Sequence, residues 1–305
     1  MQIDSRQLAA FAAVLREGSF EAAARHLHVT PSAVSQRIKG LEERLGRVLI
    51  RRATPCVATD AGQALQRHAQ QLALLEADAL RPFGLAAPSG ARTMPGAAAR
   101  LPLAIAVNAD SLATWFVPAL AALTALHDVG VELLVEDQDH SSELLRQGRA
   151  MAAVTADPRP VQGCQVTRLG AMRYLAVASP AFVARHFPAG VDDASLGAAP
   201  CVVFNRKDML QARWLRRVSR RRLDPPQHQV PSTHGFIHAA LHGLGWGMNP
   251  DVLVAPLLAS GALVELLPGT PIEVPLFWQR WRLDLAVMRD LTAGVHAAAA
   301  QMLAR

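Results

Sequence analysis

The sequence predicts an all-α N-terminal domain that is joined, through a long helix and a linker, to a two-lobed α/β domain. Residues 1 to 82 carry apolar side chains at helical spacing almost throughout. Residues 83 to 100 are rich in Gly, Pro and Ala and show no period, as is typical of a linker. Beyond residue 100, short apolar runs alternate with helical stretches, which indicates an α/β fold.

The composition indicates a soluble globular protein of two or three domains. The chain has 305 residues, of which 51% are hydrophobic and 18% charged, with a net charge of +6. The three cysteines, Cys56, Cys164 and Cys201, are scattered, which favours reduced thiols. Because we find neither a signal peptide nor an apolar span of membrane length, we expect a cytoplasmic protein with no membrane partner.

The stretch TPSAVSQRIKGLEERLG, residues 30 to 46, predicts a helix with one buried stripe and one polar face. Thr30 can cap this helix, Pro31 suits its first position and Gly46 suits a left-handed stop. A helix that ends at Gly18 and a second one capped by Ser19 precede it. The stretch VLIRRATPCVAT, residues 48 to 59, has the pattern of a two-stranded wing.

Two short helices joined by a tight turn form a helix-turn-helix, which places its second helix in the major groove of DNA. Small side chains allow close approach, Gln36 can pair with a base edge, and arginines beside the wing can hold phosphates. Residues 1 to 60 hold nine basic residues against six acidic ones. For Arg51 and Arg52 alone, a solvated turn is an equal alternative. We expect DNA contacts from Thr30, Pro31, Ser32, Ser35, Gln36, Arg37, Lys39, Arg51 and Arg52.

Residues 61 to 82 predict a linker helix whose apolar residues lie in approximate heptad phase, as in helices that pair. We therefore expect a homodimer or homotetramer. The predicted domains are a winged helix-turn-helix (1–60), a linker helix that dimerises (61–82), a flexible linker (83–100) and an α/β domain (101–305). In the last domain we predict buried strands in LPLAIAV, VELLVE, MAAVTA, YLAVAS and CVVFN, in mostly parallel sheets with a cleft between two lobes.

The segment from RQLAAF to DAGQAL, residues 6 to 65, resembles the DNA-binding part of LysR-type transcriptional regulators. The resemblance covers the whole chain and implies a two-lobed effector domain of the periplasmic-binding-protein type (type 2). Lobe 1 would hold about 101–168 plus 275–305, and lobe 2 about 169–274. Within the family, AVNADSLATWFVPAL and FNRKDMLQ resemble the branch that responds to lysine and arginine.

Ligands of such domains bind beyond the carboxyl ends of strands, where helix N-termini offer amide donors. A cationic side chain also needs a carboxylate, for which Asp110, Glu136, Asp137 and Asp208 are candidates. Alternatively, Asp110 or Ser111 is only a helix cap, and Asp208 only pairs with Lys207 or Arg206. The predicted effector-binding residues are Asp110, Ser111, Thr155, Asn205 and Asp208.

Two further features carry weaker signals. His234, His238 and His242 follow at steps of four, but no other ligand completes a zinc set, so we expect no metal and no cofactor. The run from Arg206 to Arg222 is strongly basic; a solvated helix face is the default, and DNA or an acidic partner is the alternative. We find no nucleophile elbow, P-loop or catalytic carboxylate pair, and we expect no enzyme.

Together, these observations predict a regulator that binds double-stranded promoter DNA and senses lysine or arginine. The resemblance implies control of basic-amino-acid export or related metabolic genes, with RNA polymerase as a candidate partner. The alternative is the same kind of regulator with a different small effector.

Overall fold

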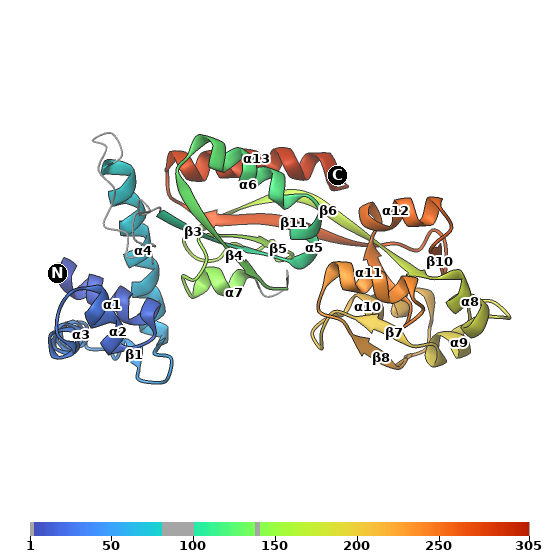
Figure 1. Ribbon diagram of the computed structural model, residues 1–305, viewed down its shortest axis with the longest axis horizontal. Coiled ribbons are helices and arrows are strands. Elements are labelled where there is room, and N and C mark those ends of the chain that lie inside the picture. The colour runs from blue at the N-terminus through green and yellow to red at the C-terminus, as the bar shows by residue number, and fades with distance from the viewer. Residues whose placement is uncertain (1–2, 81–100, 138–140, 305) are drawn as a thin grey trace.

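The computed structural model of the protein describes residues 3–80, 101–137 and 141–304 (Figure 1). The predicted linker 83–100 lies outside the described residues. The N-terminal domain contains, in chain order, α1 (Ser5–Glu17), α2 (Phe20–His26), α3 (Pro31–Leu45), β1 (Ile50–Arg51), β2 (Val57–Ala58) and the long helix α4 (Asp60–Leu80).

The caps of these helices form where the sequence places them. Ser19 Oγ accepts a hydrogen bond from the amide of Ala22, and Gly18 and Gly46 end their helices with left-handed φ angles of 76° and 64°. Strands β1 and β2 pair antiparallel, with Ile50 opposite Ala58. The predicted helix-turn-helix with a two-stranded wing is therefore present.

The α/β domain begins with β3. The start of β3 lies next to α4 in Figure 1. The first elements of the domain are β3 (Leu101–Val107), α5 (Ala109–Thr114), α6 (Phe116–Leu126), β4 (Val129–Val135), α7 (Ser141–Arg146), β5 (Ala152–Thr155) and β6 (Cys164–Ala178). The chain continues through α8 (Pro180–His186), α9 (Asp193–Ala198), β7 (Cys201–Val203), α10 (Leu210–Val218), β8 (Gln227–Gln229), α11 (Thr233–Leu241), β9 (Gly247–Pro250), α12 (Asp251–Ala259), β10 (Val264–Glu265), β11 (Ile272–Trp281) and α13 (Ala286–Met302).

One seven-stranded sheet runs through both lobes, in the order β10-β6-β11-β5-β3-β4, with β9 also paired to β6. The expectation of mostly parallel sheets is wrong for this sheet. Only the pairs β3–β4 and β3–β5 are parallel, whereas β6 and β11 pair antiparallel with each other and with their other neighbours. The reason is that two long strands carry the chain out of lobe 1 and back again (Figure 1).

Strands β6 and β11 form the connection between the lobes. They pair from Ile272–Tyr174 to Trp281–Cys164, with a register shift at Leu276/Phe277. Both strands run without a break through the positions 168/169 and 274/275, at which we predict the lobe division. In lobe 2, a short parallel pair, β7 and β8, packs beside α10 and α11 (Figure 1).

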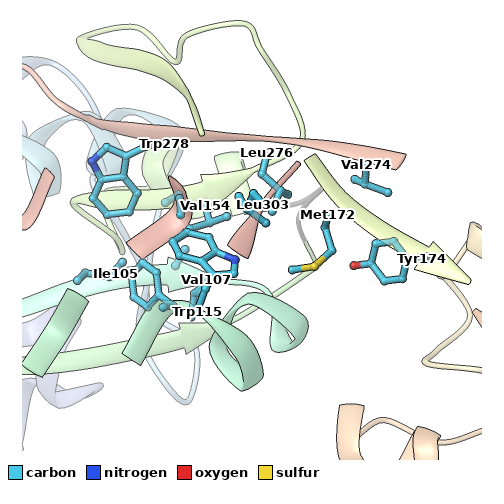
Figure 2. Close-up of a cluster of buried hydrophobic side chains, with 14 of the residues drawn as sticks. Ile105, Val107, Trp115, Val154, Met172, Tyr174, Val274, Leu276, Trp278 and Leu303 are labelled. Atoms are coloured by element: carbon cyan, nitrogen blue, oxygen red, sulfur yellow. The ribbon is translucent and has the colours of Figure 1, made fainter. Parts of the chain in front are cut away.

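The core of the larger domain lies between this sheet and the helices that cover it. Figure 2 shows how strands β3, β5, β6 and β11 send side chains into one cluster. Each of the labelled side chains is at most 8% exposed, and Trp115 and Trp278 are 1% exposed. Helices α6 and α13 pack against each other on one face of the sheet (Figure 1), and His127 Nε2 lies 2.7 Å from Asp290 Oδ2 between them.

Two local predictions differ from the structure. The stretch ATWFVPALAALTALH, which we predict as one helix, divides at Trp115 into α5 and α6, where the backbone departs from ideal helical geometry with φ −114° and the indole is 1% exposed. Strand β6 is longer than the predicted YLAVAS, and β8, β9, β10 and β11 are not among the five predicted strands. No helix in the described ranges is long and apolar enough to cross a membrane.

Candidate functional site

The N-terminal end of α3 presents small polar side chains on a rigid base. Thr30 Oγ1 accepts a hydrogen bond from the amide of Ala33 at 3.1 Å, and Pro31 occupies the first turn. The opposite face is fixed in the core by buried side chains. Of the nine predicted DNA-contact residues, Ser35 and Arg37 are half-buried, and these are exposed: Thr30, Pro31, Ser32, Gln36, Lys39, Arg51 and Arg52.

The wing is attached to α3 by Glu42, a role that the sequence alone does not indicate. Glu42 Oε1 accepts hydrogen bonds from the amides of Leu49 at 2.8 Å and Ile50 at 3.3 Å. The guanidinium of Arg52 lies 4.8 Å from the centre of the Phe20 ring, a cation–π geometry that holds it against α2. The wing backbone is therefore fixed to the recognition helix, and Arg52 is held against α2.

A cleft lies where the carboxyl ends of β3, β4 and β7 meet the start of α11 and strand β9. Its volume is about 730 Å³, open solvent included, which is in the usual range for small-molecule sites of roughly 300–1,000 Å³. Four carboxylates line it: Asp110, Glu136, Asp137 and Asp208. Amide side chains and apolar groups complete the described lining: Asn108, Asn205, Asn249, Thr233, Phe204, Phe236, Leu210, Met248, Pro250, Ala109 and Val135.

Asp110 is the centre of a hydrogen-bond network that spans the cleft. Tyr174 donates its hydroxyl to Oδ2 at 2.7 Å, and Thr233 donates to Oδ1 at 2.8 Å. Burial raises the pKa of Asp110, and the charges of Asp208 and Asp137 raise it further, while the two hydrogen bonds lower it. The same burial, together with the Asp110 charge, holds the pKa of Tyr174 well above its usual value.

Two buried asparagines offer polar atoms to the cleft. Asn108 is 2% exposed, and neither its Oδ1 nor its Nδ2 has a hydrogen-bond partner among the described residues. Asn249 is 1% exposed, and its Oδ1 likewise has no partner in the described part of the chain. Buried polar groups are normally satisfied, so these atoms indicate a place for a polar ligand.

Asp208 lines the cleft but does not form the ion pair that we considered. Its Oδ2 accepts a hydrogen bond from the amide of Phe204 at 2.8 Å, and its Oδ1 from the amide of Leu210 at 3.0 Å. Lys207 lies 3.7 Å from Glu136 instead. Asn205 Oδ1 accepts from the Lys207 amide at 2.7 Å. Asp208 and Asn205 thus shape the loop after β7 as well as lining the cleft.

Ser111 and Thr155 are not among the residues that line the cleft. Ser111 is 0% exposed in α5, and its hydroxyl has no hydrogen-bond partner among the described residues. Thr155 is also fully buried at the end of β5, where its Oγ1 accepts from the Asp157 amide at 3.1 Å. The alternative in which Asp110 or Ser111 caps α5 is wrong, because the N-cap residue is Asn108.

Neither His234–His242 nor the basic run 206–222 forms one continuous helical face. The rings of His238 and His242 stack at 6.3 Å, and no group of three metal-ligating side chains is found in the residues that the structure describes. Helix α10 ends at Val218, so Arg220 does not share the helical face of Arg213.

Several residues of the cleft are not predicted from the sequence. Asn108 directly follows a predicted strand, a position that could have identified it. Tyr174 is the only tyrosine of the chain and lies in a predicted strand. Thr233 begins the histidine-containing helix. No sequence signal places Thr233 or Asn249 beside Asp110, because the pairing of β6 with β9 and the lobe arrangement bring them there.

An exposed recognition helix with a wing, followed by a two-lobed domain with an acidic cleft, defines a DNA-binding regulator with a separate small-molecule domain. Residues 5–63 match the family model for the bacterial regulatory helix-turn-helix protein, lysR family, and residues 96–299 match the LysR substrate binding domain. The chain belongs to the LysR family of transcriptional regulators.

Several similar proteins match nearly the whole chain. The HTH-type transcriptional regulator LysG of Mycobacterium tuberculosis is 50% identical over 98% of this chain and 94% of its own length. The lysine export transcriptional regulatory protein LysG of Corynebacterium efficiens is 43% identical over 94% of both chains. Full-length LysG from Corynebacterium glutamicum with bound effector Arg is 38% identical, with a TM-score of 0.79 over 99% of this chain and 100% of that one. These relatives are named as regulators, and this chain is a regulator of the same type rather than an enzyme.

Proposed function

We propose that this regulator senses a basic amino acid, arginine or lysine, in the interlobe cleft. The observation that carries the proposal is the charge of the cleft: four carboxylates line it, and its described lining contains no basic side chain. A cationic ligand compensates for these charges, whereas an anionic one would be repelled. The bound Arg of the Corynebacterium glutamicum relative supports the same ligand class.

The rest of the cleft suits the remainder of an amino acid. Among the described residues, neither polar atom of the Asn108 amide has a partner, and neither has the Oδ1 of Asn249, whose Nδ2 donates to the Gly247 carbonyl. Asn108 can therefore donate to the α-carboxylate, and both amide oxygens can accept from the α-amino group. Phe204, Phe236 and Met248 offer apolar surface for an aliphatic chain. Ser111 and Thr155 lie outside the lining, so we do not include them among the proposed ligand contacts.

On DNA, we propose that Gln36 and the small side chains at the start of α3 contact base edges, while Arg51 and Arg52 contact phosphates. Helix α4 would pair two protomers through its apolar face, on which Leu75 is 46% exposed. Two recognition helices would then meet successive major grooves. The regulated genes would include a basic-amino-acid exporter, by analogy with the lysine export regulator of Corynebacterium efficiens.

The test is calorimetric titration of the full chain with arginine, lysine, citrulline and glutamate. Citrulline has the shape of arginine without its side-chain charge. We expect saturable binding of arginine or lysine, at least tenfold weaker binding of citrulline, and no binding of glutamate. An effector without a positive side chain that binds more tightly than arginine would support the alternative regulator with a different effector.

A matched pair of variants assigns the binding to the cleft. Asp137→Asn removes a cleft carboxylate and should weaken arginine binding about tenfold, which corresponds to about 1.4 kcal/mol. Glu143→Gln removes a carboxylate on the exposed face of α7, outside the cleft lining, and should leave the affinity unchanged. Equal effects of the two variants would show that net charge, rather than the cleft, determines affinity.

A further inference from the structure

The positive charge of the chain is concentrated in one segment of lobe 2. Residues 206–222 contain eight basic residues and one acidic residue, a net charge of +7, whereas the whole chain carries +6. The rest of the chain is therefore close to neutral. All eight basic side chains are exposed. We call them the α10 basic surface: Arg206, Lys207, Arg213, Arg216, Arg217, Arg220, Arg221 and Arg222.

Almost all of this positive charge lacks a nearby carboxylate among the described residues. Only Lys207 has a carboxylate within ion-pair distance in the described ranges, that of Glu136 at 3.7 Å. Asp208 is bonded to backbone amides. Arginines in the last turn of α10 gain from the helix dipole, about 0.3–1 kcal/mol each. That effect explains Arg216 and Arg217, but not Arg213 or the arginines beyond the helix.

Helix α10 holds the three arginines that it carries, Arg213, Arg216 and Arg217, in a fixed orientation. On its inner face, Trp214 is 0% exposed and donates its indole N–H to the carbonyl of Thr270 at 3.0 Å. Gln211 is 3% exposed and donates to the carbonyl of Val202 at 2.8 Å. With its inner face fixed, the helix loses little backbone freedom when its outer face binds a partner, which lowers the cost of binding.

We propose that the α10 basic surface is a second DNA-binding surface, which contacts the phosphate backbone beside the site held by the recognition helices. Seven of its eight residues are arginine, whose planar fork matches phosphate oxygens in a bidentate way. Because the helix-turn-helix holds the same duplex, this surface meets phosphates at a high effective concentration, so that weak contacts still contribute.

The contact falls on flanking DNA rather than on the recognised half-site. In Figure 1, the helix-turn-helix helices and lobe 2 lie at opposite ends of the long axis, with lobe 1 between them. A short duplex that covers only the half-sites therefore does not reach the α10 basic surface, whereas a longer duplex does. The proposal thus predicts a phosphate contact that depends on DNA length.

The test compares the salt dependence of DNA binding on two duplexes. A site selected from a random-sequence library by the wild-type chain is used either trimmed to its half-sites or with about 20 base pairs, roughly two helical turns, on each side. The variant Arg213→Gln/Arg216→Gln/Arg217→Gln keeps good helix formers on α10. The slope of log K against log salt is negative, and each lost phosphate contact lowers its magnitude by about 0.9. We expect a fall of about 1–3 on the flanked duplex and none on the trimmed one.

A matched variant controls for net charge. Arg168→Gln/Arg173→Gln/Arg185→Gln removes three exposed arginines outside the α10 basic surface and should leave both slopes unchanged. Circular dichroism and arginine titration check that each variant is folded. Equal slopes for wild type and the α10 variant on the flanked duplex would overturn the proposal and return this segment to its default interpretation, a solvated basic face. An equal loss in the control variant would also overturn it.

Discussion

Two glycines in helices of the N-terminal domain should respond in opposite ways to alanine. A Cβ on Gly62 in α4 would lie 2.1 Å from the carbonyl oxygen of Leu49, so the backbone must shift. A Cβ on Gly40 in α3 would meet only the end of the Gln7 side chain, at 3.0 Å. In a helix without such contacts, alanine is more favourable than glycine by about 1 kcal/mol.

We therefore expect Gly62→Ala to lower the midpoint of unfolding of the DNA-binding domain and Gly40→Ala to raise it slightly. Thermal unfolding followed by circular dichroism measures both. DNA affinity should fall with Gly62→Ala, because the contact with Leu49 fixes the start of the wing relative to α4. A Gly62→Ala variant as stable as Gly40→Ala would contradict the close approach.

Asp110 should show a conflict between stability and ligand binding. Because burial raises its pKa, the folded chain keeps this proton to higher pH than the unfolded chain. Its contribution to stability is complete below the unfolded pKa and is lost as the pH rises through the folded pKa. Asp110→Asn cannot ionise, so the variant does not lose this stability as the pH rises. We expect it to raise Tm at pH 7, by about 2–4 °C for 1 kcal/mol, and to have little effect near about pH 3.

The same substitution should weaken binding of a cationic ligand, because it removes one of the four carboxylates of the cleft. Binding of arginine to wild type should also weaken as the pH falls through the pKa of Asp110, and it should release protons. Calorimetry in two buffers with different ionisation enthalpies measures that release. A variant that loses both stability at pH 7 and affinity would indicate a structural role instead.

The recognition helix α3 and the wing should contribute differently to DNA binding. Gln36 is exposed on α3, where we propose a contact with a base edge, and Arg51 is exposed on β1, where we propose a phosphate contact. Gln36→Ala should cost about 1–3 kcal/mol on the selected site and little on random DNA. Arg51→Gln should weaken both about equally and reduce the salt slope by about 1. Fluorescence anisotropy at several salt concentrations distinguishes these outcomes.

The elements differ in how far the sequence determines them. Helices α1 to α4 could be predicted because cap residues and apolar spacing act locally, as at Thr30 and Gly46. Strand β11 was missed although its burial alternates, since Pro275 interrupts a pattern that only pairing with β6 completes. Its antiparallel direction follows from the lobe crossing, which no local pattern of residues encodes.

The candidate site shows the same division. The four carboxylates of the cleft follow or flank predicted strands, so the sequence indicated their common location. Tyr174, Thr233 and Asn249 reach the cleft only through tertiary pairing and were missed. Ser111 and Thr155 carry suitable hydroxyls, but both are fully buried outside the cleft lining, and a sequence does not show which face of an element is covered.

At the scale of the whole molecule, the hydrogen bond between Asp110 and Thr233 connects the two lobes across the cleft. Asp110 lies on α5, which follows β3, and Thr233 begins α11, so their contact at 2.8 Å joins elements 123 residues apart across the cleft. A hydrogen bond to a charged group contributes about 1.5–3 kcal/mol. Thr233→Val keeps the shape of the side chain but removes this bond. We expect the variant to populate a more open cleft and to bind arginine about tenfold more weakly, because the competent state is less populated.

Spin labels can follow the opening directly. Leu126 on α6 is 71% exposed, and Leu244, which follows α11, is 43% exposed. The three native cysteines are buried. Cysteines introduced at positions 126 and 244 should therefore be labelled selectively. Burial raises the pKa of Cys164 to about 11 and that of Cys201 to about 12, which further suppresses their reaction. Arginine should shorten and narrow the distance distribution in wild type. Thr233→Val should broaden it without ligand, whereas Thr124→Val, which removes a hydroxyl bonded within α6 to the Leu120 carbonyl, should not. If Thr233→Val behaves like wild type without ligand, the Asp110–Thr233 hydrogen bond does not hold the cleft closed. If arginine also leaves the wild-type distribution unchanged, the ligand acts on DNA binding without moving the lobes.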